Sequence, residues 1–167
     1  MKSRIIAIFS WVVVAWTCKV FLSSLPYKFA GHPDTQHIFG TIGVWMQETI
    51  NPSLGQWFAE HGAVAVGIFE LSASLLLLSP IAFWAVKKMN LVNKVPSREL
   101  IHTLGGLLSA AVMAGAIFFH LVTPLGIEVL HNGVSDGGSL FYAAVSIFIL
   151  GLISASLNGA IVRRQYN

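Results

Sequence analysis

The chain has 167 residues, of which 55% are hydrophobic and only 10% are charged, and its mean hydropathy is +0.73. Soluble domains carry about 25% charged residues, so this composition excludes an ordinary water-soluble fold. The net charge of +3 comes without a basic face of interleaved aromatic residues, which argues against nucleic acid as a partner and leaves the lipid bilayer as the expected one.

Four long apolar runs dominate the chain. An α-helix needs about 20 residues, at a rise of about 1.5 Å each, to cross a hydrocarbon core of about 30 Å. Backbone polar groups inside that core must be satisfied within the segment, so helices are the expected form. The sequence predicts a single domain over residues 1–167, an all-α membrane protein built as a four-transmembrane-helix bundle. The predicted helices cover about residues 5–25, 62–86, 99–123 and 138–162.

The first run follows Met1-Lys2-Ser3-Arg4, which resembles the charged start of a signal peptide. Its apolar stretch is too long for a signal peptide and no A-x-A-like cleavage site follows, so we expect a retained helix. Cys18 is the single cysteine. Without a C-x-x-C pair, the chain is not expected to catalyse thiol–disulfide exchange.

The segment from about residue 26 to residue 61 is long for a connection in a compact bundle. Apolar residues at near-helical spacing within Asp34–Met46 predict a short amphipathic helix at the outer membrane surface. A further helical turn is expected around Leu54–Phe58, after Asn51-Pro52-Ser53. The same apolar residues would also suit a simple cap on the bundle. In both interpretations the segment forms a lid over the outer end.

The second run contains Glu70 well inside its apolar stretch. A carboxyl group at such a position costs roughly 2.5–3.5 kcal/mol on insertion scales. It is therefore retained when it faces the protein interior, has a partner or serves a task. At about 1.5 Å per residue, Glu70 lies roughly 12 Å below the outer end of its helix.

Two further ionisable residues belong to the same half of the predicted bundle. Lys28 follows the outer end of the first run, and His120 lies about one turn inside Pro124 on the third. Lys28, Glu70 and His120 are therefore the predicted polar pocket, with Lys28–Glu70 as an ion pair and His120 as the neighbour suited to proton exchange. A purely structural ion pair that fixes helix packing explains these residues equally well. No catalytic residue is assigned.

The remaining polar residues do not predict a further functional site. His102, at the inner end of the third run, is expected at the surface, and it lies about 27 Å along the helix from His120, so the two cannot share a haem. The outer histidines match no compact metal motif, and no metal site is predicted. They are His32, His37, His61 and His131. Small residues at four-residue spacing in the third and fourth runs suit close helix packing, within one chain or in a homodimer.

Most basic residues fall on one side of the predicted membrane. Eight of the ten Lys and Arg residues lie before the first run, between the second and third, or after the fourth. The positive-inside rule assigns that side to the cytoplasm, so both termini are predicted to be cytoplasmic. The eight residues are Lys2, Arg4, Lys87, Lys88, Lys94, Arg98, Arg163 and Arg164.

Several short motifs follow one another along the chain. They are Leu25–Pro33 (LPYKFAGHP), Phe39–Gly43 (FGTIG), Gly67–Leu71 (GIFEL) with Leu75–Leu78 and Pro80, and Ala114–Ile117 with His120-Leu121. In this order they resemble the DoxX-like family of small four-helix bacterial membrane proteins, although Ser24 or Leu25 stands where the family often has a glycine. The resemblance implies a multi-pass protein of the bacterial cytoplasmic (inner) membrane, with Lys28, Glu70 and His120 as family-typical polar positions.

The resemblance also implies roles as subunits of quinone-linked oxidoreductases, partners of oxidative-stress enzymes or assembly helpers. The first hypothesis is an accessory or binding subunit whose pocket holds a quinone-like or lipid-like molecule or docks a redox or other membrane-protein partner. The alternative is a quinol-linked oxidoreductase subunit that uses Glu70 and His120 for proton handling. Without cysteine pairs or nucleotide motifs the chain has no electron carrier of its own, and we expect no intrinsic cofactor beyond a bound quinone or lipid. A proton-coupled transporter is weakened by the lack of an inverted repeat.

Overall fold

The computed structural model describes the backbone of residues 2–166 and the side chains of residues 4–164. These residues form five helices and one short antiparallel hairpin. The elements are α1 (Lys2–Phe29), α2 (Pro33–Thr49), α3 (Pro52–Lys88), α4 (Arg98–Val122), β1 (Leu130–His131), β2 (Val134–Ser135) and α5 (Ser139–Tyr166). The all-α class predicted from the sequence is confirmed.

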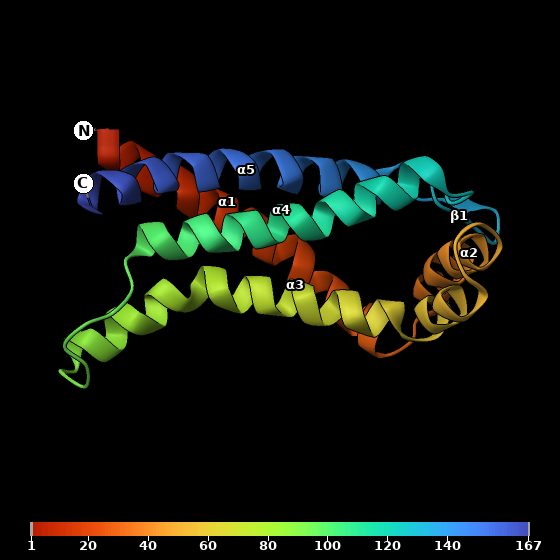
Figure 1. Cartoon of the computed structure of the whole chain (residues 1–167), viewed down its shortest axis with the longest axis horizontal. Helices are drawn as coiled ribbons and strands as arrows, with labels where there is room; N and C mark the ends of the chain where they lie inside the picture. The colour runs from red at the N-terminus through yellow and green to blue at the C-terminus, as the bar shows by residue number, and fades with distance from the viewer. Residues whose placement is uncertain (1, 167) are drawn as a thin grey trace.

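Four long helices run along the length of the molecule (Figure 1). Helices α1, α3, α4 and α5 are each long and apolar enough to cross a membrane. Both chain ends and the connection between α3 and α4 lie at one end of this bundle, whereas α2 and the β-hairpin lie at the other. The predicted bundle of four long apolar helices is therefore present.

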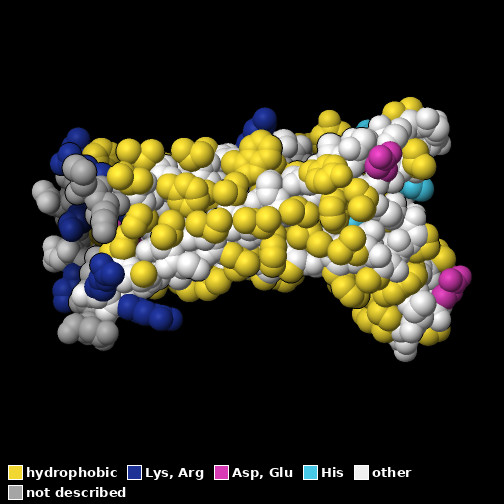
Figure 2. All heavy atoms as spheres, turned by 90° about the horizontal axis from the view of Figure 1, so that it is seen from above, with side chains coloured by type: hydrophobic (Ala, Val, Ile, Leu, Met, Phe, Trp, Pro, Cys, Tyr) yellow, Lys and Arg dark blue, Asp and Glu magenta, His cyan; other side chains and the backbone are white. Residues whose placement is uncertain are grey.

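The surface of the bundle is apolar over most of its length (Figure 2). Large side chains such as Ile8, Leu75 and Trp84 are more than 60% exposed, at 67%, 61% and 64%. Contiguous apolar surface of this extent is rare on soluble monomers. Lys and Arg gather at one end of the apolar band, whereas Asp, Glu and His side chains appear at the other. The distribution is consistent with a multi-pass membrane protein. We call the two ends the basic end and the histidine-rich end.

Helix α3 begins ten residues earlier than the sequence predicted. Asn51 caps it, because its side-chain oxygen accepts a hydrogen bond from the backbone N–H of Leu54 (3.1 Å). The turn expected at residues 54–58 is therefore the start of a 37-residue helix, about 55 Å long and far longer than a hydrocarbon core of about 30 Å. The surplus turns extend into the histidine-rich end.

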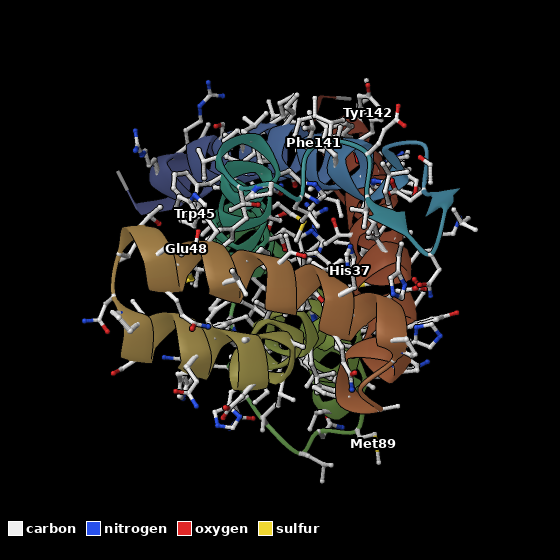
Figure 3. All side chains as sticks on the ribbon, turned by 90° about the vertical axis from the view of Figure 1, so that its right-hand side faces the viewer. His37, Trp45, Glu48, Met89, Phe141 and Tyr142 are labelled. Carbon is white, nitrogen blue, oxygen red and sulfur yellow. The ribbon has the colours of Figure 1, made fainter. Side chains whose placement is uncertain are left out.

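These first turns of α3 lie against α2, which crosses the end of the bundle (Figure 3). The contact depends on two glycines. A Cβ atom on Gly43 would lie 2.6 Å from the Cβ of Ala59, and one on Gly55 would lie 2.4 Å from the backbone nitrogen of Gln47. The segment predicted as a loop with a short helix thus forms a tight helical hairpin. The expected location of α2 at the outer membrane surface stays a prediction.

Helices α4 and α5 also approach closely through small residues. A Cβ atom on Gly106 would lie 2.8 Å from the carbonyl oxygen of Gly151, and one on Gly151 would lie 3.5 Å from the Cβ of Ala110. The small-residue motifs are therefore used within a single chain. In the middle of the bundle, one buried apolar cluster joins all four long helices. Its members are Phe21, Ala73, Met113, Ala144 and Ile147.

Candidate functional site

Lys28 and Glu70 form a buried ion pair between α1 and α3. The Nζ atom of Lys28 lies 2.6 Å from Oε2 of Glu70, as the sequence analysis expected. Ser24, which that analysis missed, completes the cluster. Its Oγ accepts from Nζ of Lys28 (2.8 Å) and lies 2.9 Å from the same Glu70 oxygen. The four-residue separation between Ser24 and Lys28 could have identified Ser24, because residues four positions apart lie on the same face of a helix.

The helix α1 continues through Pro26 to Phe29, beyond its predicted end at about residue 25. This continuation places Lys28 in the last turn of the helix, so its side chain points across to α3. The side chains of Lys28 and Glu70 are only 14% and 5% exposed. The buried carboxylate of Glu70 pairs with a lysine from another helix. The pair joins the two helices, since removing Lys28 would leave an uncompensated buried charge.

His120 lies outside this hydrogen-bond network. Its Nδ1 atom is 2.7 Å from the carbonyl oxygen of Gly126, and its ring packs edge-on against Phe141 at 5.7 Å. Among the described residues, no hydrogen bond joins His120 to Lys28 or Glu70. The structure therefore brings two of the three predicted site residues together. The third is held by the turn after α4, where Gly126 adopts a φ of +71° and brings its carbonyl to the ring.

His120 instead lines an apolar cavity of about 140 Å³ beneath α2. It is the one polar side chain among the residues that line the cavity, which come from α2, α3, α4 and the turn after α4. The others are Ile38, Phe39, Ile42, Phe58, Val66, Val112, Gly115, Ala116, Phe119 and Leu125. Sequence reasoning located His120 near the end of its helix, where the structure has it, but could not identify these partners. The aromatic residues of α2 and α3 were assigned only to a lid.

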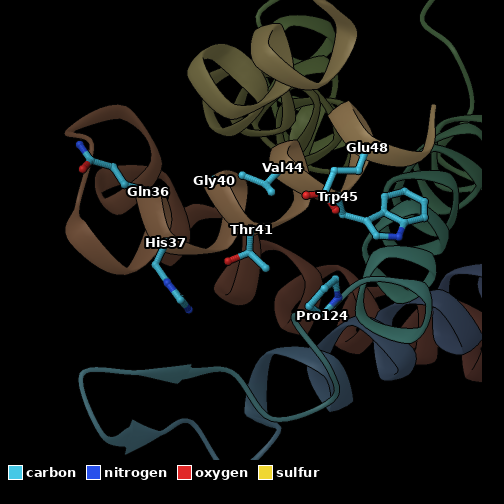
Figure 4. Close-up of a pocket in the computed structure, with 8 residues that line it drawn as sticks. All are labelled: Gln36, His37, Gly40, Thr41, Val44, Trp45, Glu48 and Pro124. Atoms are coloured by element: carbon cyan, nitrogen blue, oxygen red, sulfur yellow. The ribbon is translucent and has the colours of Figure 1, made fainter. Parts of the chain in front are cut away.

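A second, wider hollow lies on the opposite side of α2 (Figure 4). It encloses about 440 Å³ and is open to the surface at the histidine-rich end. Its lining mixes polar and apolar side chains of α2 with Pro124 from the turn after α4. The residues are Gln36, His37, Gly40, Thr41, Val44, Trp45, Glu48 and Pro124. Helix α2 therefore separates an apolar cavity from a wider and more open groove with a mixed lining.

A group of imidazoles surrounds Asp34 at the start of α2. Nδ1 of His131, on β1, lies 2.5 Å from Oδ1 of Asp34, and Nδ1 of His32 lies 3.4 Å from Oδ2. The hydrogen bond from His131 holds the pKa of Asp34 below its usual value, with the nearby imidazoles adding to the effect. The ring of His37 stacks on that of His131 at 4.6 Å. The contacts tie α2 to the β-hairpin.

The fourth outer histidine, His61, lies apart from this group. It contacts Trp57 and Glu60 on its own helix. Within residues 4–164, no three His, Cys, Asp or Glu side chains are arranged to hold a metal ion. Of the four histidines, His37 and His131 make the contacts between α2 and the hairpin.

His102 is completely buried, which corrects the expectation of a surface imidazole. Its ring packs edge-on against Trp11 at 4.9 Å. Neither ring nitrogen has a hydrogen-bond partner of good geometry among the described residues, although the Leu77 carbonyl is close by. The residue was misjudged because it lies only one turn from the start of α4, where depth along the helix suggested exposure.

Asn158 is a second buried polar residue that sequence reasoning missed. Its side-chain N–H group donates to Ser10 Oγ (2.7 Å) and to the Ser154 carbonyl (2.8 Å), while its Oδ1 atom has no partner among the described residues. The sequence feature that could have identified Asn158 is an amide side chain inside a long apolar run. This contact ties α5 to α1 in the basic half of the bundle.

Comparison of the chain with family models, with curated proteins and with solved structures finds no match.

Proposed function

We propose that the chain is an accessory or binding protein of the bacterial cytoplasmic membrane, in which the cavity beneath α2 holds a quinone-like or lipid-like molecule. The observation that carries this proposal is an apolar cavity with a single polar side chain, His120, among its lining residues. Ligand sites are typically concave and apolar, with few polar groups that fix the orientation of the ligand. The excess of Lys and Arg at the basic end supports a cytoplasmic location for both termini.

The ion pair between α1 and α3 supports the cavity from one side. Val66 lines the cavity, and Glu70 lies one helical turn further along α3. Because Lys28 binds Glu70 across the helix interface, it fixes the position of the α3 wall. In this proposal, Lys28 and Glu70 are positioning residues, whereas His120 touches the ligand. This division of roles replaces the single polar pocket expected from the sequence.

The open groove on the other side of α2 suits a second role in the same proposal. It faces away from the bundle at the histidine-rich end, where a redox or other membrane-protein partner can reach it. The resemblance of the motifs around Lys28, Glu70 and His120 to the DoxX-like family supports an accessory role of this kind.

One observation favours a quinol-linked oxidoreductase subunit as the second candidate. The Nδ1 atom of His120 faces a carbonyl oxygen, which can only accept a hydrogen bond. In a neutral ring, Nε2 is then free to accept a proton. Turnover of quinol by the purified protein with an added electron acceptor would support this candidate. Binding without turnover would support the accessory role.

The decisive test is whether a ligand disappears when the cavity is filled. Gly115 lines the cavity, and a Cβ atom added there would meet nothing within 4 Å. Gly115→Leu should therefore fold normally and occupy the cavity. We expect wild-type protein extracted in mild detergent to retain a quinone or lipid, measured by mass spectrometry, and the variant to lose it.

Gly40→Leu is the matched control. Gly40 is also helical and has equally open surroundings, but it lines the groove on the other side of α2. The control should retain the ligand. If the Gly115 and Gly40 variants carry the same molecules as the wild type, the cavity is not the binding site and the proposal is wrong.

A further inference from the structure

We infer that the cavity beneath α2 takes a single six-membered ring that carries a hydroxyl group and an apolar tail, which is the chemistry of an alkylphenol or a one-ring hydroquinol. The inference rests on the proposed function and specifies its ligand. Three observations carry it: the volume of the cavity, the aromatic rings in its wall and the hydrogen bond at Nδ1 of His120.

The volume of the cavity suits a head group of one ring. The cavity encloses about 140 Å³. An engineered apolar cavity of about 150 Å³, lined by similar side chains, accommodates benzene. A fused two-ring head group needs markedly more room than one ring, and the side chains around the cavity would have to move to admit it. The space therefore favours a benzene-sized head group over a naphthalene-sized one.

The wall of the cavity offers aromatic contacts to such a ring. Phe39, Phe58 and Phe119 all line the cavity. The centroid of the Phe58 ring lies 5.6 Å from that of Phe39 and 5.3 Å from that of Phe119. Aromatic rings favour tilted and edge-to-face neighbours at about these distances, and such pairs contribute beyond the burial of area. An acyl chain would gain the burial but not this geometry.

The hydrogen-bond partner of His120 determines whether the site accepts a hydrogen bond from the ligand or donates one to it. The Nδ1 atom lies 2.7 Å from the Gly126 carbonyl oxygen, and a carbonyl oxygen accepts but never donates. Nδ1 therefore carries the proton. In a neutral ring, Nε2 is then the acceptor. The head group must then donate a hydrogen bond, which a hydroxyl group does and a quinone carbonyl cannot.

The wall of α4 leaves room for the tail. The space beside Gly115 is open, and Phe118, three residues further along, is 50% exposed on the apolar surface of the bundle. A chain attached to the ring can leave the cavity at this point and continue along the lipid-facing surface. The head group would be enclosed while the tail remains in the bilayer.

The test compares probes that differ in one property each, using the full chain in phosphatidylcholine nanodiscs and calorimetric titration. The reference probe is para-decylphenol. Its methyl ether lacks the donor, decyl-benzoquinone offers only acceptors, and a decyl-naphthol has a second ring. We expect the phenol to bind about tenfold more tightly than the ether or the quinone, as one buried hydrogen bond allows, and the naphthol to bind more weakly than the phenol.

A lipid alcohol presents the same donor without a ring, so a diacylglycerol forms the next arm of the experiment. Weaker binding of the diacylglycerol supports a ring, and equal or tighter binding overturns that part of the inference. His120→Phe keeps an aromatic ring against Phe141 but removes the acceptor. In this variant the phenol and its ether should bind equally.

A spectroscopic measurement covers the case in which His120→Phe does not fold. In wild-type protein labelled with nitrogen-15, the Nε2 resonance should have the shift of an unprotonated nitrogen and should move when para-decylphenol binds. A protonated Nε2 before binding would overturn the inference.

The two proposals fail in different ways. If phenol, ether and quinone bind with equal affinity, the inferred ligand class is wrong, although the cavity still binds an apolar molecule. If no probe binds and Gly115→Leu changes nothing, the proposed function is wrong as well.

Discussion

Glu70 and His102 are both buried between the helices of one bundle, but their surroundings differ. The carboxylate of Glu70 receives a lysine and a serine from α1, whereas the imidazole of His102 packs against Trp11 without a hydrogen-bond partner among the described residues. A charged group cannot be buried without a partner, and a neutral ring can be, at a lower cost. The comparison indicates that Glu70 depends on charge pairing, whereas His102, in the basic half of the bundle, depends on packing.

The largest effect is expected when the lysine is removed from the ion pair between Lys28 and Glu70. Lys28→Met should lower the free energy of unfolding by about 3–5 kcal/mol, because Glu70 would remain buried without its partner. Unfolding in mixed micelles, followed by circular dichroism, measures this change. Lys19→Met is the control, since Lys19 is exposed and only approaches the ring of Trp16, and it should cost less than about 1 kcal/mol.

The double variant Lys28→Met with Glu70→Leu tests whether the two residues act as a pair. Replacing both members of a buried ion pair by apolar residues is often neutral or stabilising. The double variant should therefore recover most of the stability that Lys28→Met loses. A double variant as unstable as Lys28→Met would show that the pair does not act as a unit.

A smaller effect is expected at Asn158 in the basic half. Asn158→Leu keeps a similar side-chain volume but removes the hydrogen bonds to Ser10 and Ser154. We expect a loss of about 1–2 kcal/mol, as for neutral hydrogen bonds. If the loss matched that of Lys28→Met under the same conditions, the contrast between the two halves would not hold.

At His102 the expected change is smaller again. His102→Phe retains a ring that can pack against Trp11 and removes two nitrogen atoms that have no hydrogen-bond partner of good geometry among the described residues. The stability should change by less than about 1 kcal/mol, and it should not fall. A loss of more than about 2 kcal/mol would mean that the imidazole has a partner, such as a buried water molecule, and that His102 also depends on a polar contact.

The smallest effect concerns Asp136 in the turn before α5, outside the membrane-spanning helices. Burial alone would raise its pKa, but hydrogen bonds from the backbone N–H groups of Leu140, Gly138 and Val129 outweigh burial and hold the pKa below its usual value. The carboxylate therefore stabilises the fold above its unfolded-state pKa, and this contribution is lost as the pH falls through the lower folded-state pKa.

We expect the stability of the wild type to fall slightly more between about pH 5 and pH 3 than that of Asp136→Asn, by less than about 1 kcal/mol. Thermal unfolding across this pH range measures the difference. Identical pH profiles would show that these hydrogen bonds do not favour the charged form.

The four apolar runs determined the helices, the class of the protein and the depth of each polar residue, because helix length and hydropathy are local properties of the chain. Depth was sufficient to predict the pair between Lys28 and Glu70, since two opposite charges at the same level of a bundle gain by meeting. The sequence also indicated which end is basic.

Only the tertiary structure decided which way each helix faces. Lipid tails and the protein interior are equally apolar, so a transmembrane run has no clear polar face that reveals its rotation. That rotation buries His102 against Trp11, and the turn at Gly126 gives His120 a backbone partner of its own. Close approach at Gly43 and Gly55 places α2 across the bundle end. The cavity beneath α2 is formed by three helices and a turn together, and no single segment of the chain specifies it.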